Sequence, residues 1–221
     1  KNYSSPLEEA RADLVSLYFL MDPKLVEMGL MPSLDVGKAA YDWFILNGLM
    51  VQLRRVEPGN TIEQAHMRNR QMVAAWVYEK GLAETDDTFV DSSGAESKDA
   101  ISKVNLEGKT YYEINDYEKV RELFGELLNE VQRIKSQGDY QAGRDLIETY
   151  GVQVDQEIHQ QVLDRSEPLN IPPYGGFINP KLTPVMNEAG EMIDVTVSYP
   201  TDFVQQMLEY GRDHSFLPDY N

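Results

Sequence analysis

The chain has 221 residues, of which 42% are hydrophobic, which is ordinary for a soluble globular protein that buries a core of its own. Its formal net charge of −17 argues against nucleic-acid binding, because that function requires a basic surface. The sequence contains no cysteine, which excludes a disulfide scaffold, thiol catalysis and a cysteine-ligated metal. No apolar run is long enough to span a bilayer, so we expect a soluble protein, either cytoplasmic or periplasmic.

The sequence pattern of the first 80 residues predicts mainly helices. Residues 5–8 have the sequence Ser-Pro-Leu-Glu, a capping box that predicts a helix start. The run that follows, residues 14–21, is apolar almost all round and therefore typical of a buried helix. Further starts and stops predict three more helices. They cover residues 23–28, residues 34–55 with Ser33 as the cap, and residues 62–79, which a second capping box at 61–64 opens.

The rest of the chain mixes loops, hairpins and helices. Residues 84–100 are polar and predict a loop, and the proline-rich residues 172–180 cannot form a regular helix. Glu107-Gly108 predicts the turn of a hairpin over residues 101–114. The caps and periodicities predict helices over residues 116–134, with Asn115 or Asp116 as the cap, and over residues 139–150, 155–165 and 201–210. They also predict a second hairpin over residues 182–199.

These elements predict a mainly α fold, a multi-helix lobe with one or two small β-hairpins. The composition changes near Pro168. We therefore expect a helical lobe over residues 1–166 and a small C-terminal segment, with a hairpin and a final helix, over residues 167–221.

Residues 8–13, Glu-Glu-Ala-Arg-Ala-Asp, place three carboxylates and a guanidinium at the head of the apolar run. Glu8 has an ordinary structural role in the capping box, and Glu9 another near the positive end of the helix dipole. Asp13 lies one turn after Glu9, so both carboxylates share a face and could offer oxygen ligands to one cation. Arg11 points elsewhere and could pair with a carboxylate.

This segment resembles the dipeptidyl peptidase III family of zinc metallopeptidases, which carries Glu-Glu-Cys-Arg-Ala-Glu before an apolar helix. Two positions differ. Ala10 replaces a cysteine that is not a ligand, and Asp13 replaces the last glutamate with a shorter carboxylate. The resemblance implies that Glu9 ligates zinc and that Glu8 and Asp13 are supporting carboxylates that orient the ligands.

A second match is residues 64–70, Gln-Ala-His-Met-Arg-Asn-Arg, which is similar to the family's Ala-His-Met-x-x-Arg segment. The resemblance implies that His66 assists catalysis and that Arg70 binds substrate. A weaker match covers residues 142–146, with Tyr150 beyond it. On its own helix His66 shares a stripe with apolar residues and is expected to face inward, so a buried core histidine is the alternative.

The family's other zinc ligands lie in a His-Glu-x-x-x-His motif, which this sequence lacks. The histidines at 66, 159 and 214 do not begin such a motif, and we interpret His159 and His214 as surface residues. One glutamate cannot form a zinc site, which needs three protein ligands. We therefore expect the C-terminal part of a longer, bacterial-type, two-lobed metallopeptidase, with the missing N-terminal portion as its partner.

The resemblance thus predicts an enzyme that releases dipeptides from peptide N-termini and uses zinc. We expect this part alone to be inactive, with zinc absent or weakly bound. The alternative is a non-catalytic helical binding or scaffold module. In that case Glu8 and Glu9 only stabilise a helix start, and His66 belongs to the core.

Overall fold

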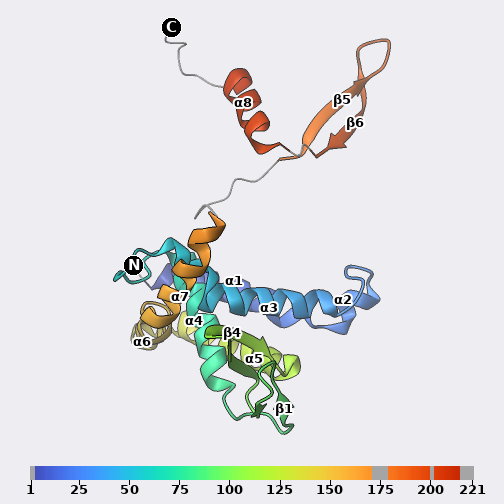
Figure 1. Cartoon of the computed structure of the whole chain (residues 1–221). Coiled ribbons are helices and arrows are strands. Elements are labelled where there is room, and N and C mark those ends of the chain that lie inside the picture. The colour runs from blue at the N-terminus through green and yellow to red at the C-terminus, as the bar shows by residue number, and fades with distance from the viewer. Residues whose placement is uncertain (1–2, 171–178, 200–201, 215–221) are drawn as a thin grey trace. The chain divides into compact units, whose positions relative to one another are not determined.

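The computed structural model describes residues 3–170, 179–199 and 202–214, and the chain divides into two compact units (Figure 1). The helical unit comprises Lys1–Ile171, and the C-terminal unit comprises Pro172–Asn221. Eight α-helices and three two-stranded antiparallel sheets lie in these residues, which confirms the predicted mainly α class. Within the described ranges, none of the helices has the length and apolar character needed to cross a membrane.

In the helical unit, most elements lie where the sequence predicts them. Asp116 and Asp139 accept backbone hydrogen bonds at the starts of their helices, and Gly138 ends a helix at φ 66°. The elements of this unit are α1 (Ser4–Leu20), α2 (Pro23–Glu27), α3 (Asp35–Leu49), η1 (Val51–Arg55), α4 (Ala65–Lys80), β1 (Phe89–Val90), β2 (Glu96–Ser97), β3 (Ile101–Leu106), β4 (Lys109–Ile114), α5 (Tyr117–Gln137), α6 (Tyr140–Tyr150), α7 (Gln156–Ser166) and η2 (Glu167–Leu169).

The hairpin of β3 and β4 turns at Glu107-Gly108, as predicted. Both residues have positive φ, 50° and 76°, the conformation that a two-residue hairpin turn requires. The polar segment before it is not wholly a loop, because β1 and β2 pair within it.

Three helix boundaries were predicted wrongly. Neither capping box forms: α1 begins at Ser4 and α4 at Ala65, and the residues that precede them give no side-chain cap. Ser5 therefore lies inside the first turn of α1, where the following proline is still tolerated. The single helix predicted over residues 34–55 ends at Leu49, because Met50 departs from helical geometry with φ −135° before the 3₁₀ turn of η1.

The core of the helical unit is built around α4, which packs against α1, α3, α5 and α6. In this core the rings of Tyr41 and Phe124 meet edge to face, with centroids 4.9 Å apart, and the Tyr41 hydroxyl donates to the Leu17 carbonyl at 2.8 Å. A smaller cluster lies beneath α7 and η1. The central position of α4 gives it fixed neighbours on several sides.

Helix α1 is buried on one face rather than all round. Ala10 and Leu14 are fully buried, whereas Val15 is 44% exposed and Phe19 50% exposed. The prediction of a buried helix is therefore confirmed for one face of α1 and wrong for the other. An apolar stripe wider than the neighbouring helices can cover leaves part of itself in solvent.

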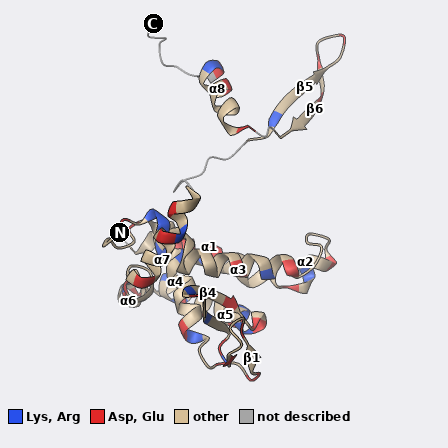
Figure 2. Ribbon diagram, viewed as in Figure 1, with Lys and Arg blue, Asp and Glu red and all other residues tan. Residues whose placement is uncertain are grey.

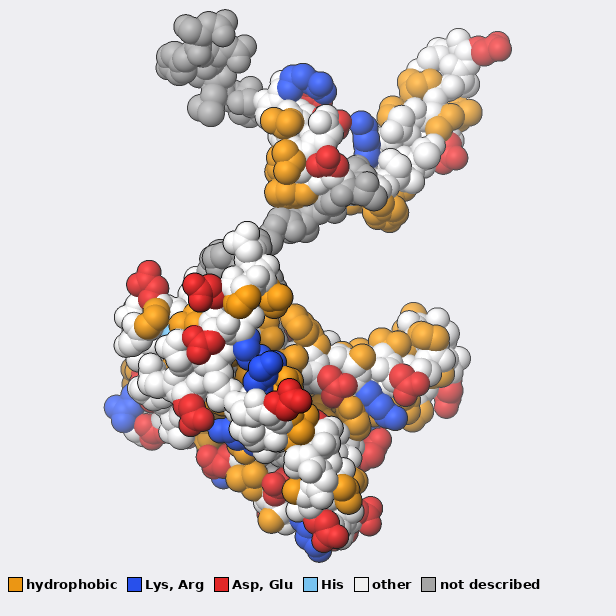
Figure 3. Space-filling view, viewed as in Figure 1, with side chains coloured by type: hydrophobic (Ala, Val, Ile, Leu, Met, Phe, Trp, Pro, Cys, Tyr) orange, Lys and Arg blue, Asp and Glu red, His pale blue; other side chains and the backbone are white. Residues whose placement is uncertain are grey.

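The C-terminal unit contains β5 (Lys181–Met186), β6 (Met192–Ser198) and α8 (Phe203–His214). Gln206 on α8 accepts from the Asn179 backbone N–H at 2.9 Å and donates to the Asn179 carbonyl at 2.8 Å. Most apolar side chains of this unit are exposed, as Figure 3 shows along the hairpin and the helix. Most of the predicted irregular segment at 172–180, and the predicted cap Thr201, lie outside the described residues.

Candidate functional site

Glu9 on α1 and His66 on α4 face each other across the packed pair of helices. The Nδ1 atom of His66 lies 3.2 Å from Oε2 of Glu9, an ion pair when the imidazole is protonated. The His66 side chain is 64% exposed and that of Glu9 is 37% exposed. The expectation that His66 faces inward is therefore wrong. His66 lies in the first turn of α4, at the edge of its contact with α1, rather than in the core.

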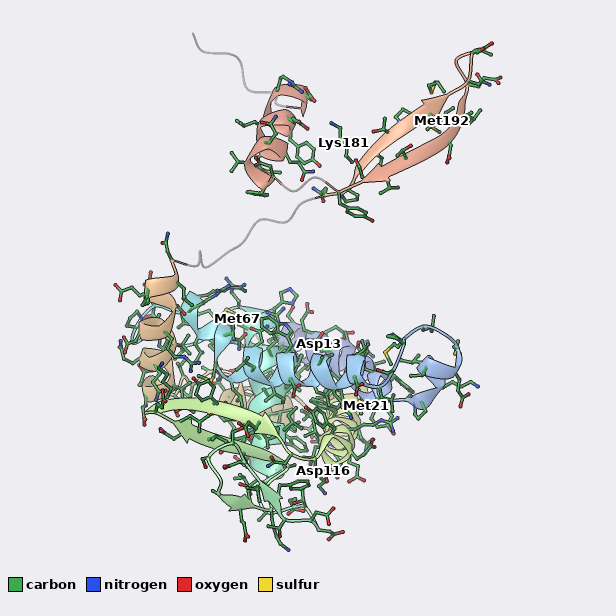
Figure 4. The ribbon with its side chains drawn as sticks, turned by 45° about the vertical axis from the view of Figure 1, so that its right-hand side comes forward. Asp13, Met21, Met67, Asp116, Lys181 and Met192 are labelled. Atoms are coloured by element: carbon green, nitrogen blue, oxygen red, sulfur yellow. The ribbon has the colours of Figure 1, made fainter. Side chains whose placement is uncertain are left out.

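A second contact joins the same two helices one turn further along. The Asn69 side chain on α4 donates from Nδ2 to Oδ2 of Asp13 at 2.6 Å. Asn69 is buried, with 1% of its surface exposed, and Asp13 is half-buried. Asp13 lies on α1 in Figure 4, and Met67 marks the first turns of α4. The acidic face of α1 is thus bridged twice to the helix that carries His66.

Arg70 lies on α4 one turn after His66 and is half-buried. Its guanidinium has no hydrogen bond or ion pair within residues 3–170, 179–199 and 202–214. The nearby Arg68, in contrast, donates from Nε to the Ile62 carbonyl at 2.7 Å. Of these two arginines, Arg70 is therefore the one available to bind a carbonyl or carboxylate of a ligand.

Glu8 does not join the contact between Glu9 and His66. Its carboxylate pairs with Lys135 of α5 at 2.6 Å and with Arg11 on its own helix, which confirms that Arg11 pairs with a carboxylate. These hydrogen bonds, that from Lys135 first, lower the pKa of Glu8. Glu8 and Arg11 line an open groove of about 1060 Å³ between α1 and α5. Charges of both signs are interspersed over the helical unit, as Figure 2 shows.

The weaker sequence match, on α6, packs beside α4 without reaching Glu9. Arg144 pairs with its neighbour Asp145 at 3.2 Å. The Tyr150 hydroxyl donates to Glu79 of α4 at 2.8 Å, and burial, with this bond, raises the pKa of Tyr150 to about 12. Gln71 of α4 donates to the Tyr150 carbonyl at 3.2 Å. These bonds hold α6 against α4 and thereby support the helix that carries His66.

His159 is buried, so its interpretation as a surface residue is wrong. Only 1% of its surface is exposed, and its Nε2 lies 3.0 Å from the Val56 carbonyl oxygen. The polar residues around it in the sequence lie on the outer side of α7, whereas His159 lies beneath the chain that follows η1. It is a hydrogen-bonded core residue. The side chain of His214 lies outside the described part of the chain.

A zinc site in a protein needs at least three protein ligands. Among the described residues, no group of three or more His, Asp or Glu side chains lies close enough to hold a metal ion. Glu9 presents a partly exposed carboxylate, which suits one zinc ligand, and His66 lies directly beside it. The described residues alone therefore do not complete a zinc site.

Comparison with known families places the chain. The sequence model of peptidase family M49, the dipeptidyl peptidase III family, matches residues 1–172. The chain belongs to peptidase family M49. The match spans the helical unit, including both helices of the contact between Glu9 and His66, and the family assignment implies a peptidase that acts on peptides. A search of curated proteins found no match to the chain.

Sequence reasoning missed Asn69. The signal for it was a small amide between Met67 and Met72, in a stretch of α4 that is otherwise largely buried. Spacing along α4 placed Asn69 beside His66 but could not reveal its partner on α1, because that contact is between distant segments.

Proposed function

We propose that this chain is the part of a zinc-dependent dipeptidyl peptidase that carries one metal-ligating carboxylate and the substrate-binding helix. The observation that supports this most directly is the contact of Glu9 with His66. These residues come from distant segments, yet α1 and α4 bring together the carboxylate assigned to the metal and the histidine assigned to catalysis. The remaining ligands would come from a His-Glu-x-x-x-His segment, which this sequence does not contain.

In this proposal each residue has a separate role. Bound zinc would supply Lewis acidity and an activated water. Glu9 holds the metal, and His66 donates a hydrogen bond to negative charge that develops on the substrate carbonyl. Arg70 binds a carbonyl or carboxylate of the peptide, for which its unpaired guanidinium is suited.

In this proposal the carboxylates of Asp13 and Glu8 hold α1 in position. Asp13 accepts from Asn69 with one oxygen, and its other oxygen could accept from the N–H of a ligating imidazole. Glu8 ties α1 to α5 through Lys135 and so holds Glu9 in place indirectly. Because the chain lacks the histidine motif, we expect it to cleave no peptide by itself.

The first test compares Glu9→Ala with the wild-type peptidase that contains this chain. We expect zinc affinity to fall by more than about 100-fold and dipeptide release to fall with it, since loss of a direct ligand exceeds the 10–100-fold typical of an outer-shell partner. Zinc content and release of dipeptides from a peptide N-terminus are measured on the same samples. Glu63→Ala, an exposed carboxylate just before α4, is the matched control and should change neither quantity.

Two further variants separate metal binding from substrate binding. His66→Ala should keep zinc but lower kcat about 10²–10³-fold, in the range for loss of one transition-state donor. Arg70→Ala should keep zinc and mainly raise KM, with the exposed Arg212→Ala as its control. A wild-type protein that is inactive and metal-free, or a Glu9→Ala variant that is unchanged, would instead favour the non-catalytic helical module.

A further inference from the structure

The groove between α1 and α5 is separate from the contact of Glu9 with His66, because neither residue lines it. Its volume is about 1060 Å³. On α5 the lining residues begin at Glu118 and end at Gln132, so the groove follows that helix for about 21 Å at 1.5 Å per residue. That length is about four turns of a helix.

The floor of the groove is apolar, and its shape is already formed. Ala12 and Val15 of α1 are exposed there, Val15 by 44%. The Tyr18 ring reaches α5 at Gly125, where a Cβ would lie 2.8 Å from Cε2 of the ring. The guanidinium of Arg121 lies over the same ring, 4.8 Å from its centroid. The ring is therefore held on α5, and the floor offers apolar surface to a ligand without rearrangement.

One rim of the groove is a row of carboxylates on α5. Glu118, Glu122 and Glu126 follow each other at intervals of four residues, so they share one face of the helix, and all three are exposed. In the part of the chain that the structure describes, the first and last of them make no hydrogen bond or ion pair, and the middle one has a single ion pair at 3.8 Å. Like charges at this spacing destabilise a helix. Glu130, on α5 outside the groove, is instead paired with Arg133 at 2.7 Å.

The cations that line the groove are already engaged. Arg11 is paired with Glu8, and Arg121 donates from Nε to the Tyr18 carbonyl at 3.0 Å. The charge that remains for a ligand is therefore negative. Its complement is a helix with an apolar stripe beside basic side chains one turn apart. A second copy of this chain does not supply such a helix, because no two Lys or Arg residues in the sequence lie three or four positions apart.

We propose that this groove is the docking site for an amphipathic helix of a partner protein. The apolar stripe of that helix covers Ala12 and Val15, and its Lys or Arg side chains, spaced four residues apart, face the carboxylate row on α5. A helix laid in an apolar groove is a common mode of peptide recognition. The inference goes beyond the proposed function and does not depend on the zinc assignment.

The experiment uses a synthetic helical peptide of about 15 residues, the length of the groove. It carries leucines on one stripe and three lysines at intervals of four residues along the edge of that stripe. The control peptide has glutamates in place of the lysines. Isothermal titration calorimetry with the 221-residue chain should give a micromolar Kd for the lysine peptide and no binding for the glutamate peptide. Equal binding of both peptides, or no binding up to about 1 mM, would overturn the inference.

Variants of the rim test the charge. Glu118→Gln, Glu122→Gln and Glu126→Gln are combined in one protein, and Kd should rise about tenfold, because exposed ion pairs each contribute modestly. The dependence of Kd on salt should weaken as well. The control makes the same change in net charge at three exposed glutamates outside the groove: Glu57→Gln, Glu63→Gln and Glu188→Gln. Similar losses in both proteins would show that only the overall charge matters, which contradicts docking in the groove.

A variant of the floor tests the location. Ala12→Arg places a long cationic side chain in the groove and should abolish binding of the lysine peptide. Ser16→Arg, at an exposed position of α1 that does not line the groove, is the matched control and should bind as wild type does. Circular dichroism and Tm show whether both proteins fold. Wild-type affinity in a folded Ala12→Arg variant would overturn the inference.

Two further outcomes would assign the groove to another occupant. The peptidase that contains this chain should bind the lysine peptide as the chain does. Binding by the chain alone would mean that the peptidase covers the groove itself, which overturns docking of a partner. A dimer of the chain that Ala12→Arg dissociates would overturn it too. Loss of zinc binding in Glu9→Ala, or its absence in the wild type, tests the proposed function and leaves this inference unaffected.

Discussion

The helical unit and the C-terminal unit use the same local signals but differ in what those signals bury. Asp116 caps α5, and Asp202 accepts from the Gln205 backbone N–H at the start of α8. In the helical unit the apolar faces meet and close a continuous core. In the C-terminal unit, cross-strand pairs such as Leu182 with Val197 remain at least half exposed. Local pattern decides which face can be buried, and neighbouring elements decide whether it is.

The first and largest test of this contrast is a pair of phenylalanines. Phe124→Ala removes a ring that is fully buried between Tyr41 and Phe44, and should lower the free energy of unfolding by about 3–5 kcal/mol. Phe203→Ala, at a ring on α8 that is 39% exposed, should cost less than half as much. Urea unfolding of both variants gives the comparison. Equal losses would show that the C-terminal unit is packed as tightly as the core.

The second test adds a single methyl group to a helix of each unit. A Cβ at Gly48 would lie 2.5 Å from the Arg70 carbonyl oxygen, so Gly48→Ala must separate α3 from α4 at a cost of about 1–3 kcal/mol. Gly211 on α8 has no atom within 4 Å of such a Cβ, so Gly211→Ala should be neutral or stabilise by up to about 1 kcal/mol. Thermal unfolding measures both. A stabilising Gly48→Ala would contradict the tight packing of α3 on α4.

The third and smallest test compares two valines. Val131→Ala removes two fully buried carbon atoms and should cost at least about 1.6 kcal/mol, at about 0.8 kcal/mol for each CH₂. Val197→Ala, at a side chain on β6 that is 50% exposed, should change stability by less than about 0.5 kcal/mol. Chemical denaturation again gives both values. A cost above 1 kcal/mol at Val197 would mean that the hairpin face is covered in solution.

Elements that are fixed by nearby residues could be predicted from the sequence. Asp139 and the turn at Glu107-Gly108 act within a few residues of their own position, and the structure confirms them. Of the two caps predicted for α5, Asn115 and Asp116, the structure has Asp116. The helix starts predicted from the two capping boxes were wrong. A helix can begin at any of several neighbouring residues, and the spacing of a capping box alone does not determine which one.

Burial of single polar residues could not be predicted, because it depends on elements distant in sequence. His66 shares a stripe with apolar residues yet is exposed, because it lies in the first turn of α4. His159 has polar neighbours in sequence yet is covered by the chain at Val56. The resemblance named Glu9 and His66, and the fold brings them together. It could not name Asn69, because the hydrogen bond of Asn69 to Asp13 joins segments that are distant in sequence.

Two glycines have a consequence for how the site can move. Gly48 brings α3 against the backbone of α4 at Arg70, and Gly151 brings the end of α6 against it at Arg68, where a Cβ would lie 2.8 Å from the carbonyl oxygen. Backbone packed directly on backbone leaves no flexible side chains to absorb sliding. We therefore expect helix α4 to move with α3 and α6 as one rigid body. Any closure around a peptide would be a hinge rotation outside this trio rather than a shear within it.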